Sequence, residues 1–230
     1  MFFFDPMYIL IVLIPGLLIS GGASLLVRAP FNKYSRVGSR HGYTGAQAAE
    51  RLLSDAGIYD VSVVPTHGYL SDHYNPQTKQ LALSEQVYSS SSLAAVGIAC
   101  HEAGHAIQHA RSYAPLWIRS ALVPMAGIGS SIGYFVMLAG LFLHPYVVGF
   151  GALIFSAVLL FQLVTLPVEF DATARAKRLV VEAGIVDADE RYGIDRVLNA
   201  AAMTYVAAVI STLLTLAYFL LRAGLLGGDE

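Results

Sequence analysis

Four long runs of apolar residues divide the chain. None of them contains Asp, Glu, Lys or Arg, and they cover residues 7–27, 120–143, 146–166 and 201–221. About 20 apolar residues in helical conformation cross the hydrocarbon core of a bilayer. We therefore predict four transmembrane helices, with kinks at Pro15 and Pro124 in the first two. Because no Lys or Arg precedes Arg28, the first run lacks the basic start of a signal peptide and is expected to remain as an anchor.

The segment between the first and second runs predicts a small α+β structure. Thr44 can cap a helix from Gly45 to about Ala56, with Gly57 as its C-terminal stop and an inward face of Ala48, Leu52 and Leu53. Three short strands are then predicted at Val61–Val64, Gly68–Ser71 and Lys79–Ser84, with a turn at Asn75–Thr78. An apolar helix follows, for which residues 89–92, all serine, offer N-caps.

Composition supports a membrane location. Hydrophobic residues make up 56% of the chain and charged residues 13%, with a mean hydropathy of +0.59, whereas about 25% of residues are charged in soluble domains. Of the 14 basic residues, seven lie between the first and second runs and five between the third and fourth. By the positive-inside rule, segments 28–115 and 167–200 are cytoplasmic and both termini are outside. The single Cys100 excludes an internal disulfide, which suits a reducing compartment.

The most specific motif is His101-Glu102-Ala103-Gly104-His105, an HExxH sequence within the helix predicted after the serines. Residues four apart lie on one face of a helix, so both imidazoles can bind one ion. Zinc lowers the pKa of a bound water to about 7, and a neighbouring carboxylate can take its proton. The sequence therefore predicts His101 and His105 as zinc ligands and Glu102 as the general base.

A catalytic zinc site normally has a third protein ligand. His109 is excluded, because it would lie about 12 Å from His101 along a straight helix. Glu169 and Asp171 follow the third apolar run, where Pro167 suits the first turn of a new helix. These two carboxylates point about 200° apart, so only one can face the metal. Glu169 has the longer reach and is the preferred candidate.

Four stretches resemble the bacterial membrane-embedded neutral zinc metallopeptidases of the YugP type, which are gluzincins: residues 70–76, 101–108, 165–172 and 198–206. More distantly, the layout is similar to the integral-membrane heat-shock and prenyl-protein zinc proteases, in which the glutamate of an E-x-x-x-D stretch completes the site. The resemblance implies Glu169 as the third ligand. The position of the aspartate is occupied here by Thr173, which leaves Thr173 and Asn199 as candidates for orienting the imidazoles.

A tetrahedral oxyanion usually needs an electrophile besides the metal. His73, near the predicted turn, is our candidate for this catalytic role. Tyr205 and Arg119, at the membrane boundary, are further possibilities that the sequence does not rank.

Together these features predict a mainly α membrane protein, one unit of residues 1–230 with about four transmembrane helices and a small cytoplasmic zincin-like α+β catalytic part. We expect a zinc-dependent endopeptidase of the cell inner (plasma) membrane, with its active site facing the cytoplasm. The expected partners are the lipid bilayer and a peptide or membrane-protein substrate, and no nucleic acid. One alternative is a non-catalytic zinc-binding protein, whose metal would gain a fourth ligand such as Asp171 or His73. A transporter is the other, but the four apolar runs carry none of the charges that it would need along its pathway.

Overall fold

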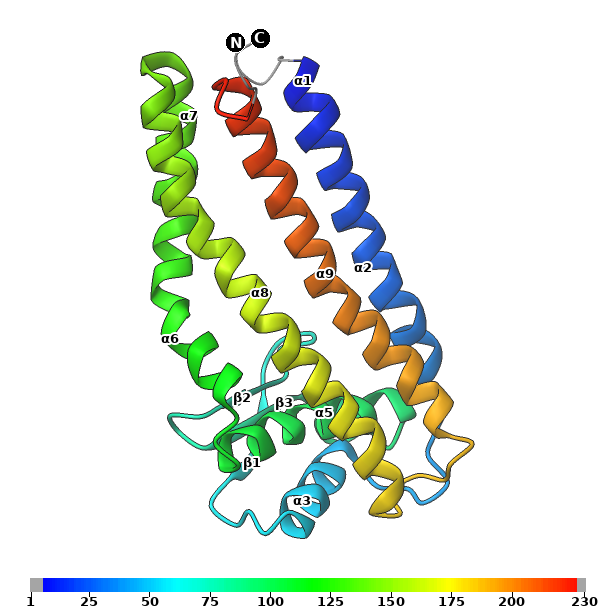
Figure 1. The fold of residues 1–230 in the computed structure, drawn as a ribbon. Helices are drawn as coiled ribbons and strands as arrows, with labels where there is room; N and C mark the ends of the chain where they lie inside the picture. The colour runs from blue at the N-terminus through cyan, green and yellow to red at the C-terminus, as the bar shows by residue number, and fades with distance from the viewer. Residues whose placement is uncertain (1–5, 227–230) are drawn as a thin grey trace. The chain divides into compact units, whose positions relative to one another are not determined.

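The computed structural model describes residues 6–226 and is mainly helical (Figure 1). In chain order, the helices and strands are α1 (Pro6–Tyr8), η2 (Ile9–Leu13), α2 (Ile14–Tyr34), α3 (Gly45–Asp55), β1 (Ser62–Thr66), β2 (His73–Asn75), β3 (Gln80–Ser84), α4 (Glu85–Tyr88), α5 (Leu93–Ala110), α6 (Ala114–Ile128), η3 (Gly129–Gly133), α7 (Tyr134–Leu143), α8 (Pro145–Glu182) and α9 (Arg191–Arg222). The elements η2 and η3 are short π-helical turns that continue directly into the α-helices beside them.

The prediction of four membrane-length helices is confirmed. Among residues 6–226, four continuous helical stretches are long and apolar enough to cross a membrane: Pro6–Tyr34, Ala114–Leu143, Pro145–Glu182 and Arg191–Arg222. Large apolar side chains point outward along them; Leu18, Phe142 and Leu153 are each about 70% exposed. Exposed apolar surface on this scale is typical of contact with lipid.

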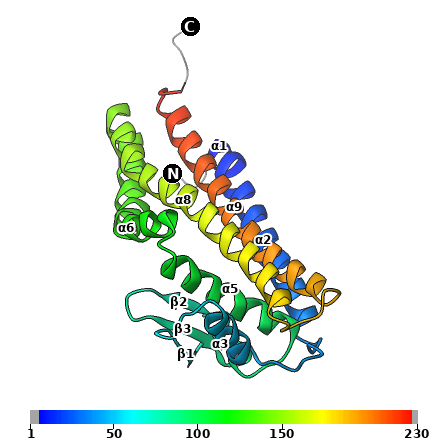
Figure 2. The same cartoon turned by 60° about the horizontal axis from the view of Figure 1, so that its bottom comes forward.

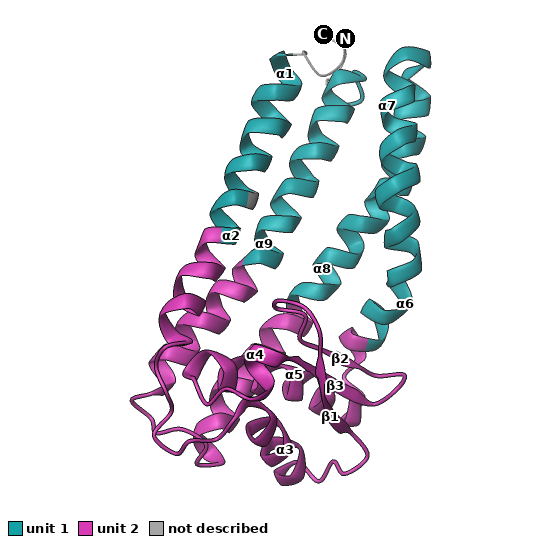
Figure 3. Ribbon diagram, turned by 180° about the vertical axis from the view of Figure 1, so that it is seen from behind, with its two compact units in different colours: residues 1–24, 117–166, 204–230 teal, residues 25–116, 167–203 magenta. Residues whose placement is uncertain are grey.

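The chain forms two compact units (Figure 3). Unit 1 comprises Met1–Ser24, Trp117–Leu166 and Thr204–Glu230, and unit 2 comprises Leu25–Leu116 and Pro167–Met203. Helices α2, α6, α8 and α9 contribute residues to both. All of the predicted zinc ligands belong to unit 2.

Within unit 1, glycines allow the helical hairpin of α6–α7 and α8 to pack closely. A Cβ built on Gly133 would lie 2.6 Å from the backbone nitrogen of Phe155, and one built on Gly129 would lie 2.9 Å from the carbonyl oxygen of Ile154. No side chain fits at either place without movement of the backbone. The close helix approach expected at small residues in a bilayer is therefore present here.

Unit 2 has its hydrophobic core around α5, whose residues Val96, Ala99 and Ala103 are fully buried. Helix α3 packs against α5, as both Figure 1 and Figure 2 show. The predicted inward face of α3 is confirmed, since Ala48, Leu52 and Leu53 are each 3% exposed or less.

The predicted start and stop of α3 are also confirmed. The Thr44 side chain accepts a hydrogen bond from the backbone of Gln47, and the Gln47 side chain accepts one from the backbone of Thr44. These reciprocal bonds form a capping box. After the C-cap residue Ala56, Gly57 has φ +74°, the left-handed conformation that glycine adopts most easily.

A three-stranded sheet of order β1-β3-β2 precedes the HExxH helix. β3 pairs in parallel with β1, from Ser62 opposite Gln80 to Thr66 opposite Ser84, and antiparallel with β2. The expected second strand at Gly68–Ser71 is wrong, because β2 begins only at His73. Gly68 (φ +114°) and Leu70 (φ +53°) have positive φ, which an extended strand cannot contain.

Pro167 does not begin a new helix, contrary to the sequence-based expectation. It lies inside α8, which continues without interruption to Glu182. Proline in a helix removes one backbone hydrogen bond and costs about 3 kcal/mol. Val168 and Ala172, both fully buried in unit 2, supply packing that keeps the helix intact through this position.

Candidate metal centre

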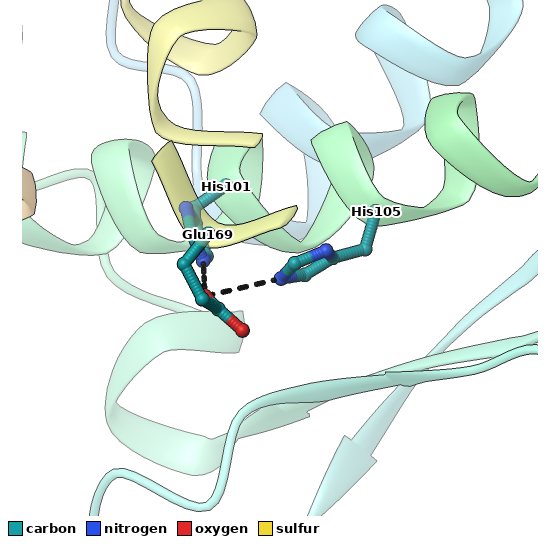
Figure 4. A group of neighbouring side chains, drawn as sticks. All are labelled: His101, His105 and Glu169. Carbon is teal, nitrogen blue, oxygen red and sulfur yellow. Dashed lines mark ion pairs between the residues drawn. The ribbon is translucent and has the colours of Figure 1, made fainter. Parts of the chain in front are cut away.

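Helix α5 brings the two histidines of HExxH to the same side. Ser92 caps this helix by accepting a hydrogen bond from the backbone of Ala95, and its 18 residues continue to Ala110. His101 and His105 lie one turn apart, with ring centroids 4.8 Å apart and planes at 83°. Both rings point toward Glu169, which comes from α8 (Figure 4).

Glu169 completes a group of three possible ligands. Its Oε2 atom lies 3.3 Å from Nε2 of His101 and 3.5 Å from Nε2 of His105. One ligand atom from each of the three residues lies within 4.8 Å of the others. The structure therefore brings together the three residues that the sequence nominated.

Gly104, between the two histidines, lets α8 come this close to α5. A Cβ built on Gly104 would lie 2.9 Å from the carbonyl oxygen of Ala172 and 3.3 Å from its Cα. Contacts this short with backbone atoms could be relieved only by moving one helix away. Gly104 therefore allows α5 and α8 to pack closely, and this close packing places Glu169 beside the two histidines.

Each imidazole uses its other nitrogen for a contact with a nearby side chain. Nδ1 of His101 lies 3.3 Å from Oγ1 of Thr173, and Nδ1 of His105 lies 3.0 Å from Oε1 of Gln108. Of the two orienting residues considered from sequence, Thr173 is in place. Asn199 instead accepts a hydrogen bond from Lys177. Because both Nδ1 atoms have partners, the Nε2 atoms are the ones directed at Glu169.

Asp171 turns away from this centre, as its spacing from Glu169 predicts. Its carboxylate accepts a hydrogen bond from Gln108 at 2.8 Å and two from Arg175, at 2.6 and 3.2 Å. It is thus held in an ion pair one turn along α8.

The centre is buried and favours positive charge. Glu169 is 2% exposed, His105 8% and Glu102 9%. Burial is the largest single effect on the pKa of His105 and lowers it, but the hydrogen bond with Glu169 and the negative charges of Glu102 and Glu169 together raise that pKa above its ordinary value. A site that stabilises a buried imidazolium also has the electrostatic character to attract a metal cation.

The donor set fits zinc. Catalytic zinc sites use His nitrogen and carboxylate oxygen at about 2.0–2.2 Å, which in tetrahedral geometry places neighbouring ligand atoms roughly 3.3–3.5 Å apart. The separations of 3.3 and 3.5 Å between Glu169 and the two histidines agree with this value. Within residues 6–226, the group that could hold a metal contains three protein ligands, the number that leaves one position open for water.

His73 and His109 lie outside this group. Nδ1–H of His73 donates to the carbonyl of Ser71 at 2.8 Å, and the ring is exposed at the start of β2. His109, which the sequence excluded as a ligand, contacts the Tyr74 hydroxyl at 2.8 Å. Burial is the main cause that raises the pKa of Tyr74 to about 12, so this hydroxyl keeps its proton. The role of His73 stays a prediction, and Tyr205 and Arg119 belong to unit 1.

Sequence reasoning missed Gln108. Residues three apart on a helix are neighbours, and a glutamine at such a position can reach the imidazole. This spacing is the signal that could have identified it.

Comparison with known proteins agrees with this geometry. Residues 9–224 match a family described as "Putative neutral zinc metallopeptidase". The chain is 41% identical over 216 residues, 94% of its own length, to the "Putative membrane protease YugP" of Bacillus subtilis (strain 168), of which 96% is covered. No solved structure matches. Because the match extends over nearly the whole chain and includes all of the residues at the candidate centre, the protein belongs to this family of neutral zinc metallopeptidases.

Proposed function

We propose that the protein is an integral-membrane zinc-dependent endopeptidase, with His101, His105 and Glu169 as the metal ligands. The observation that carries this proposal is the convergence of two Nε2 atoms and one carboxylate oxygen from α5 and α8. Zinc bound there would polarise a scissile carbonyl and lower the pKa of a water molecule. The family to which the chain belongs supports the same class of activity.

Glu102 is the proposed general base. It follows His101 directly on α5, is 9% exposed, and lies close enough to His105 for its negative charge to raise the pKa of that ring. A buried carboxylate beside the ligands can take a proton from the attacking water and deliver it to the leaving amine. His73 is retained as the proposed electrophile for the oxyanion.

The proposed substrate is a peptide or a membrane protein, cleaved on the cytoplasmic side of the plasma membrane. The membrane-length helices and the membrane protease of Bacillus subtilis support the membrane location. The basic residues of segments 28–115 and 167–200 support the cytoplasmic side.

The decisive experiment is Glu102→Gln in the purified full chain. This variant should keep one zinc per chain, measured by atomic absorption, and should cleave fluorescently labelled β-casein at least about 100-fold more slowly, because general acid–base catalysis typically contributes 10²–10⁴-fold.

Two further variants serve as controls for this measurement. Glu169→Gln should lose both zinc and cleavage, whereas Glu50→Gln, on the exposed side of α3, should change neither. Cleavage by Glu102→Gln at the parental rate would overturn the proposed mechanism. A parental protein that binds zinc and cleaves nothing would favour the non-catalytic alternative.

A further inference from the structure

Gln108 is a buried polar side chain beside the candidate centre with hydrogen-bond partners on both sides of its amide. It is fully buried on α5, and each polar atom of its amide has a partner. Oε1 lies 3.0 Å from Nδ1 of His105, while Nε2 donates to the Val168 carbonyl and to Oδ2 of Asp171, both at 2.8 Å. Two of these partners belong to α8, so one side chain joins a proposed ligand to the neighbouring helix.

These contacts permit only one orientation of the amide. A backbone carbonyl and a carboxylate are acceptors, so the group that faces Val168 and Asp171 must be the NH₂ donor. Oε1 then faces His105 and can only accept. Nδ1 of His105 must therefore carry the proton, and the lone pair of a neutral ring is on Nε2, the atom that lies 3.5 Å from Glu169.

We propose that Gln108 is a positioning residue that fixes the tautomer and the ring orientation of His105 for metal binding. This inference rests on the proposed metal site but goes beyond it. Imidazole ligands in zinc sites usually donate their second N–H to a carboxylate, a carbonyl or water. Here the amide oxygen of Gln108 is the acceptor for His105. The carboxylate of Asp171 does not contact the imidazole directly and accepts a hydrogen bond from the same amide.

Asp171 and Arg175 form the outer part of this chain of contacts. Arg175 donates two hydrogen bonds to Asp171, which leaves the carboxylate ionised and fixed where it can accept from Gln108. An acceptor on the NH₂ side polarises the amide and strengthens its oxygen as an acceptor. Without Asp171, the amide would lose one of the two acceptors that dictate its orientation.

The two proposed histidine ligands are thus held differently. His101 contacts a neutral hydroxyl at 3.3 Å, whereas His105 contacts an amide at 3.0 Å that is itself held by a carboxylate. A hydroxyl can rotate and either donate or accept, so Thr173 does not fix a tautomer. Thr173→Val therefore provides a matched control on the other imidazole.

The test uses the full-length protein in detergent, with zinc and Co²⁺ as the probes. Gln108→Met, which keeps the length of the side chain and removes its polar atoms, should weaken zinc binding by about 10- to 100-fold in competition with a chelator. It should also alter the d–d absorption spectrum of the Co²⁺-loaded protein, because that spectrum depends on how the ligands are arranged around the metal. Thr173→Val should have the smaller effect on both.

Asp171→Asn tests whether the carboxylate acts through the amide. It should weaken zinc binding in the parental protein and have no further effect in Gln108→Met. Additive effects of the two substitutions would contradict the proposed chain of contacts, and a zinc affinity of Gln108→Met within about twofold of the parent would overturn the positioning role itself.

If Gln108→Met does not fold, as judged by thermal unfolding of the zinc-free protein, Asp171→Asn decides alone, because the Asp171 side chain is 29% exposed. An unchanged zinc affinity and Co²⁺ spectrum in that variant would then overturn the inference. These outcomes differ from failure of the proposed function, in which the parental protein itself would bind no zinc or Glu102→Gln would remain active.

Discussion

At the candidate centre, the contacts of each histidine ring show which of its two nitrogens faces Glu169. His101 and His105 each use Nδ1 for a contact with Thr173 or Gln108, and so present Nε2 to Glu169. The same principle applies at helix ends, where backbone N–H groups lack partners within the helix. In unit 2, Thr44 and Ser92 supply oxygens for such groups at the starts of α3 and α5.

The capping box of α3 gives a prediction at this scale. Thr44→Ala removes the side-chain oxygen bonded to the Gln47 backbone and should lower the free energy of unfolding by about 1 kcal/mol, within a usual range of 0.5–2 kcal/mol. Thr44→Ser keeps the oxygen and should restore most of the loss. Denaturant titration followed by circular dichroism would measure both, and equal stability of Thr44→Ala and the parent would contradict the role of the cap.

At the scale of elements, the contact between α5 and α8 decides whether a centre exists. Gln108 of α5 donates hydrogen bonds to Val168 and Asp171 of α8. Glu169 of α8 contacts both histidines of α5. Val168 and Asp171 lie 60 and 63 residues after Gln108 in the sequence. Only close packing of the two helices holds these groups within hydrogen-bond distance.

Gly104→Ala should disturb this contact. The new Cβ would lie 2.9 Å from the Ala172 carbonyl, so we expect a loss of about 1–3 kcal/mol in stability together with weaker zinc binding, as Glu169 moves away from the histidines. Thermal unfolding and zinc content would measure the two effects.

Gly97→Ala on the same helix is the matched control. Its nearest contacts would all be side-chain atoms of Ile194, with Cγ2 closest at 3.0 Å, and a side chain can move more easily than a backbone carbonyl. This variant should keep the parental zinc content. Loss of zinc in both variants to the same extent would show that the α5–α8 contact has no special role.

At the scale of the whole molecule, the chain combines membrane-length apolar helices with polar segments that carry the candidate centre. Long helices with large exposed apolar side chains need lipid around them, while the capped α3 and the small sheet are typical of water-exposed structure. The distribution of basic residues then predicts the side of the membrane on which each polar segment lies.

Cysteine labelling in intact cells would test this orientation. In a Cys100→Ala background, His144→Cys, in the connection between α7 and α8, should react with a membrane-impermeant maleimide. Thr78→Cys, in the turn between β2 and β3, should react only after permeabilisation. Both positions are exposed, so burial does not account for a difference. The opposite labelling pattern would place the candidate centre outside.

Local patterns made several elements predictable. Apolar run length identified the membrane helices, serine and threonine marked the caps, and the four-residue spacing of His101 and His105 placed them on one face of α5. The start of β2 was mispredicted because the positive φ angles of Gly68 and Leu70 are not evident from the apolar pattern. The continuation of α8 through Pro167 was missed because packing at Val168 and Ala172 outweighs the local preference of proline.

The membrane-length helices, the HExxH helix and the choice of Glu169 could be predicted from run length, residue spacing, side-chain reach and family resemblance. The parallel pairing of β1 with β3, the approach of α8 permitted by Gly104 and the contacts of Gln108 became evident in the three-dimensional structure. The physical reason is that helical periodicity and capping depend on neighbours within one or two turns. A contact between α5 and α8 depends on how two surfaces fit, which no short stretch of sequence specifies.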